Sequence, residues 1–306
     1  MAAVANETRT IAVTGSTGLV GKALADSFTG SDTKVKSIVR RQPASYQDEI
    51  QWDAKNGFVN TDLLEGLDAV VHLAGESIAE GRWNDAKKRR IKDSRIVGTT
   101  TLCSALAGLN NKPKVLVSAS AIGFYGNRGS EELTEAVSAG EGFLPDVCVG
   151  WEEATKIAAD AGIRVVNLRI GVVIAKDGGA LPAMLTPFKM GVGGKVGSGD
   201  QYWSWVSLTD LVGMIHHAVN TESLTGPVNA VSPNPVTNLE FTKTLGKVLG
   251  RPTIFPMPGF MAKLVIGEMA NDLLLSSARV IPEQLQSSGF EFKHVDLGEA
   301  ISTALG

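Results

Sequence analysis

Three glycines spaced three residues apart, Gly15, Gly18 and Gly21, follow directly after the short apolar run 11–14. Residues 22–28 have helical patterning, so the stretch predicts a strand, a tight turn and a helix. In such a turn the first glycine permits a positive φ, the second lets the backbone approach a pyrophosphate, and the third lets the helix pack closely on the strand. The helix N-terminus also attracts anions, so the turn favours a nucleotide phosphate site. The alternative is a tight turn without a ligand.

The rest of the first 175 residues alternates apolar strands with helices. We expect strands near 35–39, 69–73, 115–118 and 163–168, and helices near 83–109 and 151–161. Apolar strands linked by helices predict a parallel sheet covered on both faces. We therefore expect an α/β fold, a doubly wound Rossmann sheet, over residues 8–175.

The remaining residues, 176–306, have a different character. Seven of the chain's 34 glycines fall within 178–199. We expect this stretch to be a flexible, loop-rich lid over the substrate side, without a long regular element. Behind it we expect the last sheet elements and a small C-terminal domain packed against the main sheet, with a strand at 228–231 and helices near 206–219, 237–249, 261–268 and 282–286.

Charge, hydropathy and cysteine use exclude several classes of protein. The chain has 29 basic and 32 acidic residues, a net charge of −3, so nucleic acid is disfavoured as a partner. No apolar run approaches the roughly 18 residues of a membrane span. Cys103 and Cys148 lie far apart and the four histidines show no ligand spacing, which indicates a reducing compartment and no metal site. We expect a cytoplasmic protein, or one from a plastid or mitochondrial interior if a transit peptide is removed. The sequence does not determine the number of subunits.

Arg40 stands at the end of the second expected strand, nineteen residues after Gly21. An Asp or Glu at this point binds the ribose hydroxyls of NAD, whereas a guanidinium suits the extra 2′-phosphate of NADP. Arg41 follows directly, so the alternative is a pair of solvated surface arginines. The sequence predicts NADP in preference to NAD.

Further motifs follow the glycine turn in order along the chain. They are Leu73-Ala74-Gly75-Glu76, Arg82-Trp83, Ser94-Arg95, Trp151-Glu152, Leu168-Arg169-x-Gly171-Val172-Val173, Gly197-x-Gly199-x-Gln201, Ser204-Trp205, Asp210, Pro282 and Gly289-Phe290-Glu291-Phe292. With them the chain resembles the extended branch of the short-chain dehydrogenase/reductase superfamily. More narrowly it resembles the atypical epimerase family whose members are labelled nucleoside-diphosphate-sugar epimerase, putative cell-division inhibitor or chloroplast-division factor. The resemblance implies an NADP-binding Rossmann domain with a small C-terminal region over the cofactor, and a largely unassigned reaction.

The resemblance also implies which residues contact the cofactor. They are Gly15, Thr17, Gly18, Leu19, Val20 and Gly21 on the turn, Arg40 at the 2′-phosphate, and Leu73, Ala74, Gly75, Arg90, Arg95, Ser118 and Val172 along the crevice. Helix geometry supports Arg95 independently, because it lies four residues after Ile91 at the edge of the apolar stripe, where its charge needs a partner such as phosphate. The neighbouring Lys87, Lys88 and Arg89 are expected to form a solvated face.

The chain departs from the superfamily in its chemistry. Typical members use Tyr-x-x-x-Lys, in which the lysine lowers the tyrosine pKa so that the phenol can exchange a proton with the substrate. Four residues beyond Tyr46, Tyr125 and Tyr202 stand Ile50, Gly129 and Val206, so the pair is absent. The stretch 146–150, where it would be expected, offers no comparable acid.

Three other residues are candidates for catalysis. Ser120 would hydrogen-bond the substrate, and Tyr125 would donate a proton if a neighbour lowered its pKa. Glu76 would act as acid or base, because it follows a central strand and burial would raise its pKa. Trp83, Gln201 and Trp205, with Asp210, are expected to line or close the substrate pocket. The alternatives are a serine that satisfies backbone, a packed tyrosine and core tryptophans.

Two hypotheses about function follow. The first is an NADP-dependent oxidoreductase or epimerase acting on a small sugar-like or carbonyl substrate, with non-standard proton transfer. The second is an NADP-binding regulatory protein with little turnover, in organelle or cell division. The phosphate-binding pattern fits both, and the missing Tyr-x-x-x-Lys favours the second. Polar residues beyond the expected nicotinamide position favour the first, which we prefer.

Overall fold

The computed structural model describes residues 9–306, apart from the side chains of residues 265 and 266, so residue 8, the predicted domain start, lies outside it. Eight strands form the main sheet in the order β13-β8-β6-β5-β1-β2-β3-β4. Their bounds are β1 Arg9–Thr14, β2 Thr33–Val39, β3 Glu49–Asp53, β4 Phe58–Val59, β5 Ala69–His72, β6 Val115–Ala121, β8 Arg164–Ile170 and β13 Gly226–Ala230. Only the β3–β4 pair is antiparallel. The predicted α/β Rossmann class is confirmed.

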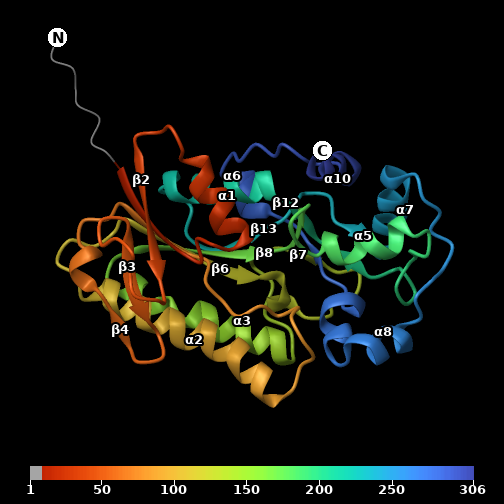
Figure 1. Ribbon diagram of the computed structural model, residues 1–306, viewed down its shortest axis with the longest axis horizontal. Helices are drawn as coiled ribbons and strands as arrows, with labels where there is room; N and C mark the ends of the chain where they lie inside the picture. The colour runs from red at the N-terminus through yellow and green to blue at the C-terminus, as the bar shows by residue number, and fades with distance from the viewer. Residues whose placement is uncertain (1–8) are drawn as a thin grey trace, which may run out of the picture.

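Helices cover both faces of this sheet (Figure 1). On one face lie α1, Leu19–Ser27, and α6, Leu208–Asn220; on the other lie α2, Asp85–Ala107, α3, Phe143–Ala154, and α4, Lys156–Asp160. The period of two along β6 divides its side chains between two cores. Val115 and Val117 pack with Leu211 of α6, whereas Leu116 packs with Leu102 of α2.

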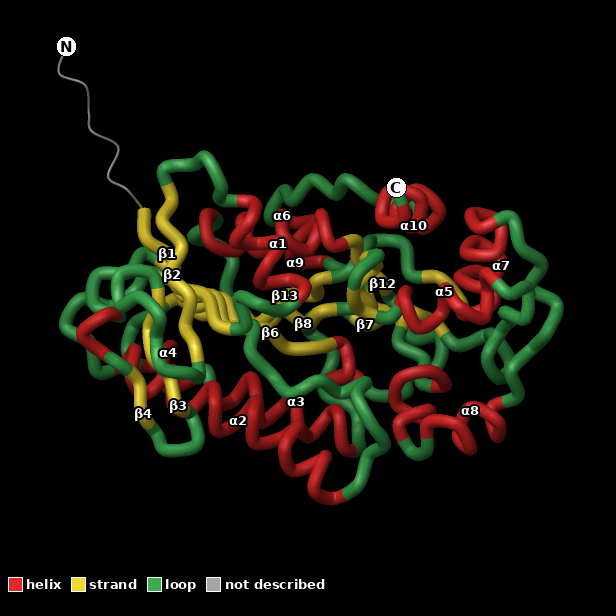
Figure 2. The backbone as a smooth tube through the Cα atoms, viewed as in Figure 1, coloured by secondary structure: helices red, strands yellow, loops and turns green. Residues whose placement is uncertain are grey.

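The C-terminal region lies at one end of the main sheet, around α5, α7 and α8 (Figure 2). Its helices are α5 Leu181–Lys189, α7 Asn238–Leu249, α8 Gly259–Ile266, η3 Asn271–Leu275, α9 Glu283–Ser287 and α10 Leu297–Leu305; its short strands are β9 Val172–Ala175, β10 Gly178–Gly179, β11 Tyr202–Trp203, β12 Trp205–Ser207, β14 Val236–Thr237 and β15 Arg279–Val280, which pairs with β7 Glu132–Leu133. Helical turns at η1 Thr61–Leu63 and η2 Ile122–Tyr125 complete the fold. The boundary at 175 stays a prediction, although β13 returns from the second part to complete the main sheet beside β8.

The expectation that the loop-rich stretch 178–199 contains no long regular element was wrong in part, because the helix α5 occupies its first half. The glycines flank this helix and none lies within it, so Leu181, Leu185 and Phe188 can bury one apolar face. Two other boundaries also moved. Helix α3 begins eight residues before the expected start at 151. Strand β6 continues to residue 121 instead of ending at 118, which places Ser120 within the strand.

Candidate functional site

The glycine turn has the geometry that its sequence predicts. Gly15 adopts φ +68°, and the N–H of Gly18 donates to the carbonyl oxygen of Gly15 at 2.9 Å. A Cβ on Gly21 would stand 2.2 Å from that same oxygen, so only glycine lets α1 begin this close to β1. Gly18 is the N-cap residue and has no capping side chain. The first N–H groups of α1 therefore remain available to an anion.

A buried clamp that the sequence reasoning missed joins this turn to the next strand. The Oγ1 atom of Thr14 accepts the N–H groups of Leu73 and Ala74 at 2.9 and 3.0 Å, and lies 2.8 Å from His72 Nδ1. His72 Nε2 lies 3.0 Å from Thr99 Oγ1. Burial lowers the pKa of His72 to about 4, so the ring is neutral near pH 7. The clamp fixes the predicted contacts Leu73 and Ala74 against the turn.

The two arginines at the end of β2 differ in their partners. Arg41 pairs with Glu49 through both terminal guanidinium nitrogens, and this contact lowers the pKa of Glu49. Arg40 is exposed and has no hydrogen bond or ion pair with another described residue. Of the two, only Arg40 has a guanidinium free for an anionic ligand.

Arg95 of α2 lies beneath the loop that follows β5. Its Nη1 donates to the carbonyl oxygen of Glu76 at 3.0 Å, and its Cζ lies 5.0 Å from the Trp151 ring centroid. A Cβ on Gly75 would stand 3.3 Å from that Cζ, so the glycine lets the loop lie close against the guanidinium. Burial lowers the pKa of Arg95, and no carboxylate among the described residues pairs with it.

The expectation that burial raises the pKa of Glu76 was wrong. The Lys87 Nζ lies 2.8 Å from Glu76 Oε1, and Arg90 Nε lies 3.5 Å from the same oxygen. These partners, Lys87 first, lower the pKa of Glu76 and so disfavour it as a proton donor. The expected solvated face was also wrong in part, since Lys87 is buried and Lys88 pairs with Glu268.

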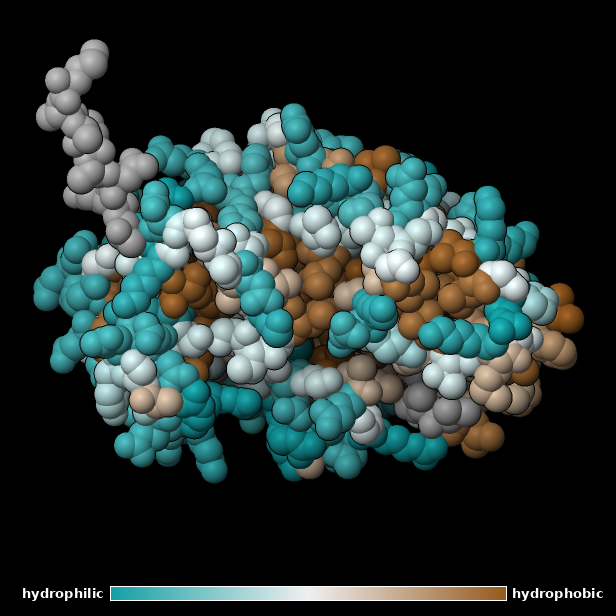
Figure 3. Space-filling model, turned by 45° about the horizontal axis from the view of Figure 1, so that its top comes forward, coloured by the Kyte–Doolittle hydropathy of each residue, from teal (hydrophilic) through white to brown (hydrophobic). Residues whose placement is uncertain are grey.

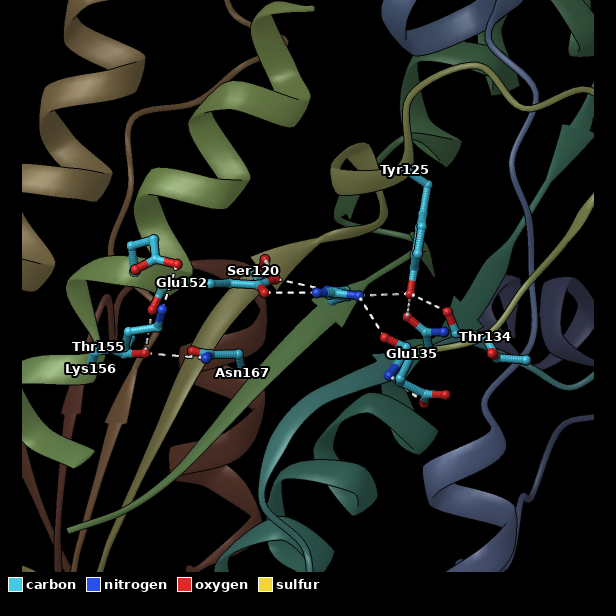
Figure 4. A network of polar contacts seen from close by, with 11 residues as sticks. Ser120, Tyr125, Thr134, Glu135, Glu152, Thr155, Lys156 and Asn167 are labelled. Atoms are coloured by element: carbon cyan, nitrogen blue, oxygen red, sulfur yellow. Dashed lines mark hydrogen bonds and ion pairs between the residues drawn. The ribbon is translucent and has the colours of Figure 1, made fainter. Parts of the chain in front are cut away.

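Ser120 begins a buried polar network that crosses the end of the sheet (Figure 4). Its Oγ donates to Glu152 Oε1 of α3 at 2.6 Å. Arg169 of β8 binds the two oxygens of Glu152 at 2.9 and 2.8 Å, and its Nη1 donates to the Tyr125 hydroxyl at 3.0 Å. Burial lowers the pKa of Arg169, but the hydrogen bonds and the charge of Glu152 raise it by more. The pKa of Arg169 therefore lies above its ordinary value. Glu152 and Arg169 both belong to the sequence motifs above, but the sequence did not predict that they form a buried ion pair.

Tyr125 lies inside this network and has no exposed surface. Its hydroxyl donates toward Asn229 Oδ1 at 2.7 Å and also lies 3.1 Å from the Thr134 carbonyl oxygen. Burial raises the pKa of Tyr125 despite the nearby Arg169, which is opposite to the lowering that a proton donor needs. The structure thus contradicts the expected lowering and gives Tyr125 a packing role.

Other predicted crevice residues have their polar atoms engaged within the fold. Ser118 is fully buried, with Oγ 3.3 Å from the Ala119 carbonyl oxygen, and the Val172 N–H donates to the Ser204 carbonyl oxygen at 2.8 Å. Neither group is free to bind a cofactor in this conformation. Cys148, in the stretch that replaces the usual catalytic pair, has its thiol pKa raised to about 12 by burial.

The predicted substrate residues also lie in the interior. Trp205 is fully buried and its Nε1 donates to the Asn234 carbonyl oxygen. Gln201 donates to two carbonyl oxygens, and Trp83 packs edge-on against Phe143 with its Nε1 bonded to Ile78. Asp210 accepts two backbone N–H groups from residues 293 and 294. The expectation that Trp205 and Gln201 form a pocket wall was wrong, because each completes internal packing.

The parallel sheet and the glycine turn together define a Rossmann-fold protein. A family model described as the NAD dependent epimerase/dehydratase family matches residues 11–230, and a domain of unknown function, DUF1731, matches residues 257–304. The chain belongs to the NAD dependent epimerase/dehydratase family, which confirms the resemblance read from its motifs.

Relatives match this chain over nearly its whole length. Epimerase family protein Mb2239 of Mycobacterium bovis is 42% identical over 294 residues, which are 96% of this chain and 97% of the relative. A protein of Arabidopsis thaliana, "Epimerase family protein SDR39U1 homolog, chloroplastic", is 36% identical over 95% of this chain and 85% of its own. The crystal structure of human epimerase family protein SDR39U1 with NADPH has a TM-score of 0.88 and 31% identity, covering 97% and 99% of the two chains.

Proposed function

We propose that this chain binds NADP(H) and is an oxidoreductase or epimerase acting on a small carbonyl or sugar-like substrate. The observation that carries the cofactor part is the difference between Arg40 and Arg41. Arg41 forms an ion pair with Glu49. Arg40 has no partner among the described residues, and it stands at the strand end where a 2′-phosphate would lie. The NADPH in the human relative's structure supports the same assignment.

The remaining cofactor contacts would come from the crevice edge. Uncapped N–H groups at Leu19, Val20 and Gly21 suit the pyrophosphate, with Thr17 beside them on the turn. Arg95, which lies against Gly75, adds a positive charge without a carboxylate partner among the described residues. Arg90 is held by Glu76, so its contribution would require that ion pair to open. These donors fit a dinucleotide phosphate group.

The chemistry would centre on Ser120 and Glu152. When bound, the nicotinamide exchanges a hydride with the substrate. Ser120 directs its hydrogen to Glu152, so toward a substrate its oxygen acts as an acceptor for a hydroxyl group. This arrangement suits the alcohol form of a substrate, with Glu152 held in place by Arg169. The proton that an alcohol loses along with its hydride would pass to Ser120 Oγ, while Ser120 gives its own hydrogen to the Glu152 carboxylate. Neither Tyr125 nor Glu76 takes part in this transfer.

A second function, an NADP-binding regulatory protein with little turnover, is favoured by the state of two side chains. The phenol of Tyr125 is enclosed and the thiol of Cys148 has a pKa of about 12, so neither supplies a ready proton near pH 7. The printed name of the Arabidopsis relative places that protein in the chloroplast. For this chain, the cytoplasm or an organelle interior stays a prediction.

Turnover assays separate the two functions. The purified protein with NADP⁺ or NADPH is tested against panels of secondary alcohols, carbonyl compounds and nucleotide sugars, by cofactor absorbance and product analysis. The enzyme hypothesis predicts turnover with one class, reduced at least about tenfold in Ser120→Ala and retained in Tyr46→Phe, an exposed control. Saturable cofactor binding without turnover on any panel would favour the regulatory function.

A further inference from the structure

The C-terminal region exposes a concentration of large apolar side chains. Among the described residues, twelve large apolar side chains are exposed, and eight of them fall within 190–192 and 254–264. These eight are Met190, Val192, Ile254, Phe255, Met257, Phe260, Met261 and Leu264. Met190, Ile254, Phe260 and Leu264 are each more than 70% exposed, with values of 72, 71, 71 and 74%. Single exposed apolar residues are ordinary, but a cluster of this kind marks an interaction surface.

Backbone bonds hold the two segments side by side. The Met257 N–H donates to the Lys195 carbonyl oxygen at 2.8 Å, and the Gly197 N–H donates to the Met257 carbonyl oxygen at 2.9 Å. Both segments lie at the end of the molecule away from β2, β3 and β4 (Figure 1), and brown side chains gather along this end in Figure 3. We call these eight side chains, together with Lys189, Lys247, Arg251 and Lys263, the apolar–basic face.

The charges on this face have one sign. Lys189, Lys247, Arg251 and Lys263 are exposed, and none of them forms an ion pair with another described residue. No Asp or Glu occurs within 186–199 or 247–264, although the whole chain carries a net charge of −3. The exposed apolar segments therefore contain, or are flanked in sequence by, cations that no described acidic residue neutralises.

We propose that the apolar–basic face docks on an anionic phospholipid surface. Protruding Phe, Ile, Leu and Met side chains enter the boundary between headgroups and acyl chains, while Lys and Arg attract anionic headgroups. Such contact needs no spanning segment, and no described helix is long and apolar enough to cross a membrane. The net charge of the whole chain does not indicate this face, because acidic residues in other parts of the sequence outnumber its cations.

Charge also disfavours a second copy of the chain as the occupant. A symmetric dimer places the same patch of each subunit against the other, so the cations of one copy would be brought close to the cations of its partner copy. Like charges brought together in this way oppose association. An anionic membrane instead complements every charge on the face, and the proposal is independent of the cofactor site.

Vesicle sedimentation tests this directly. The full chain, saturated with NADPH, is mixed with vesicles of phosphatidylcholine alone or of phosphatidylcholine with phosphatidylglycerol. We expect binding to the anionic vesicles to exceed binding to the neutral ones by at least about tenfold, and to fall as salt is raised. Equal binding to both vesicles, or none to either, would overturn the proposal.

Variants show whether vesicle binding depends on the apolar–basic face or is nonspecific. The double variant Phe260→Ser with Leu264→Ser removes two apolar side chains that are already exposed to water. Folding should therefore be unaffected, and thermal melting checks this. Vesicle binding should fall at least about tenfold, as it should in Arg251→Glu with Lys263→Glu. Phe58→Ser, 47% exposed at the opposite end, is the matched control and should bind like the wild type. If sedimentation equilibrium instead shows a dimer that the Phe260 and Leu264 changes dissolve, a second copy covers the face and the proposal fails.

Discussion

At the scale of single residues, the neutral form of His72 holds the loop after β5 against Thr14 at the end of β1. Thr14 Oγ1 already accepts two backbone N–H groups, so its own hydrogen points to His72 Nδ1. The ring must then carry its hydrogen on Nε2 and donate it to Thr99. A second proton on Nδ1 would face a donor instead of an acceptor. The clamp therefore requires the neutral ring.

This requirement predicts a loss of stability in acid. The pKa of His72 is about 4 in the folded protein and near 6.5 when unfolded, so the unfolded chain binds the proton first as pH falls. Stability from this group is complete above pH 6.5 and is lost toward pH 4, by about 2 kcal/mol between pH 7 and pH 5. Urea unfolding at both pH values measures it. His72→Asn should remove that part of the pH dependence, and an unchanged dependence would contradict the clamp.

Tyr125 offers a second prediction, because its packing role differs from the catalytic one expected from sequence. Tyr125→Phe removes the donor to Asn229 Oδ1 and leaves Arg169 Nη1 with only the Glu135 carbonyl oxygen at 3.5 Å, which should cost about 1–3 kcal/mol of unfolding free energy. NADPH affinity should stay within about twofold of wild type, because the hydroxyl lies outside the crevice. Tyr46→Phe, at an exposed site, is the control. A stable variant that has lost only turnover would restore the catalytic role.

At the scale of elements, local signals predicted the structure well. The predicted helix 237–249, ended by Gly250, is confirmed as α7. Gly250 adopts φ +62°, and Thr237 forms a capping box with Glu240, so both ends depend on residues only a few positions apart. The glycine turn was found for the same reason. Helix α5 was missed because glycine content was averaged over 178–199, which hid the glycine-free stretch between its ends.

The glycine turn itself makes a prediction at this scale. Gly21→Ala places a Cβ against the Gly15 carbonyl oxygen, so α1 must move away from β1. We expect about 1–3 kcal/mol less unfolding free energy and at least about tenfold weaker NADPH binding. Gly108→Ala is the matched control, since its φ is −80° and the nearest atom lies 3.6 Å from its Cβ. Calorimetry and urea unfolding compare the two, and equal behaviour would contradict the close approach.

At the scale of the whole molecule, the polar network shows what sequence reasoning could not reach. Ser120 and Glu152 are 32 residues apart, and Tyr125 and Asn229 are 104 apart, so no local spacing signals either bond. Three strands and helix α3 must assemble before these groups meet. The same limit explains why Trp205 and Gln201 were placed in a pocket wall, since their burial depends on packing around η3 and residue 234.

The most direct measurement of the central claim is the affinity of the wild-type protein for NADPH and NADH by isothermal titration calorimetry, together with Arg40→Ala and Arg41→Ala. The free guanidinium of Arg40 predicts that wild type binds NADPH at least about tenfold more tightly than NADH. Arg40→Ala should remove this preference, whereas Arg41→Ala should retain it, because Arg41 is bound to Glu49. Equal wild-type affinities for the two cofactors would contradict the account.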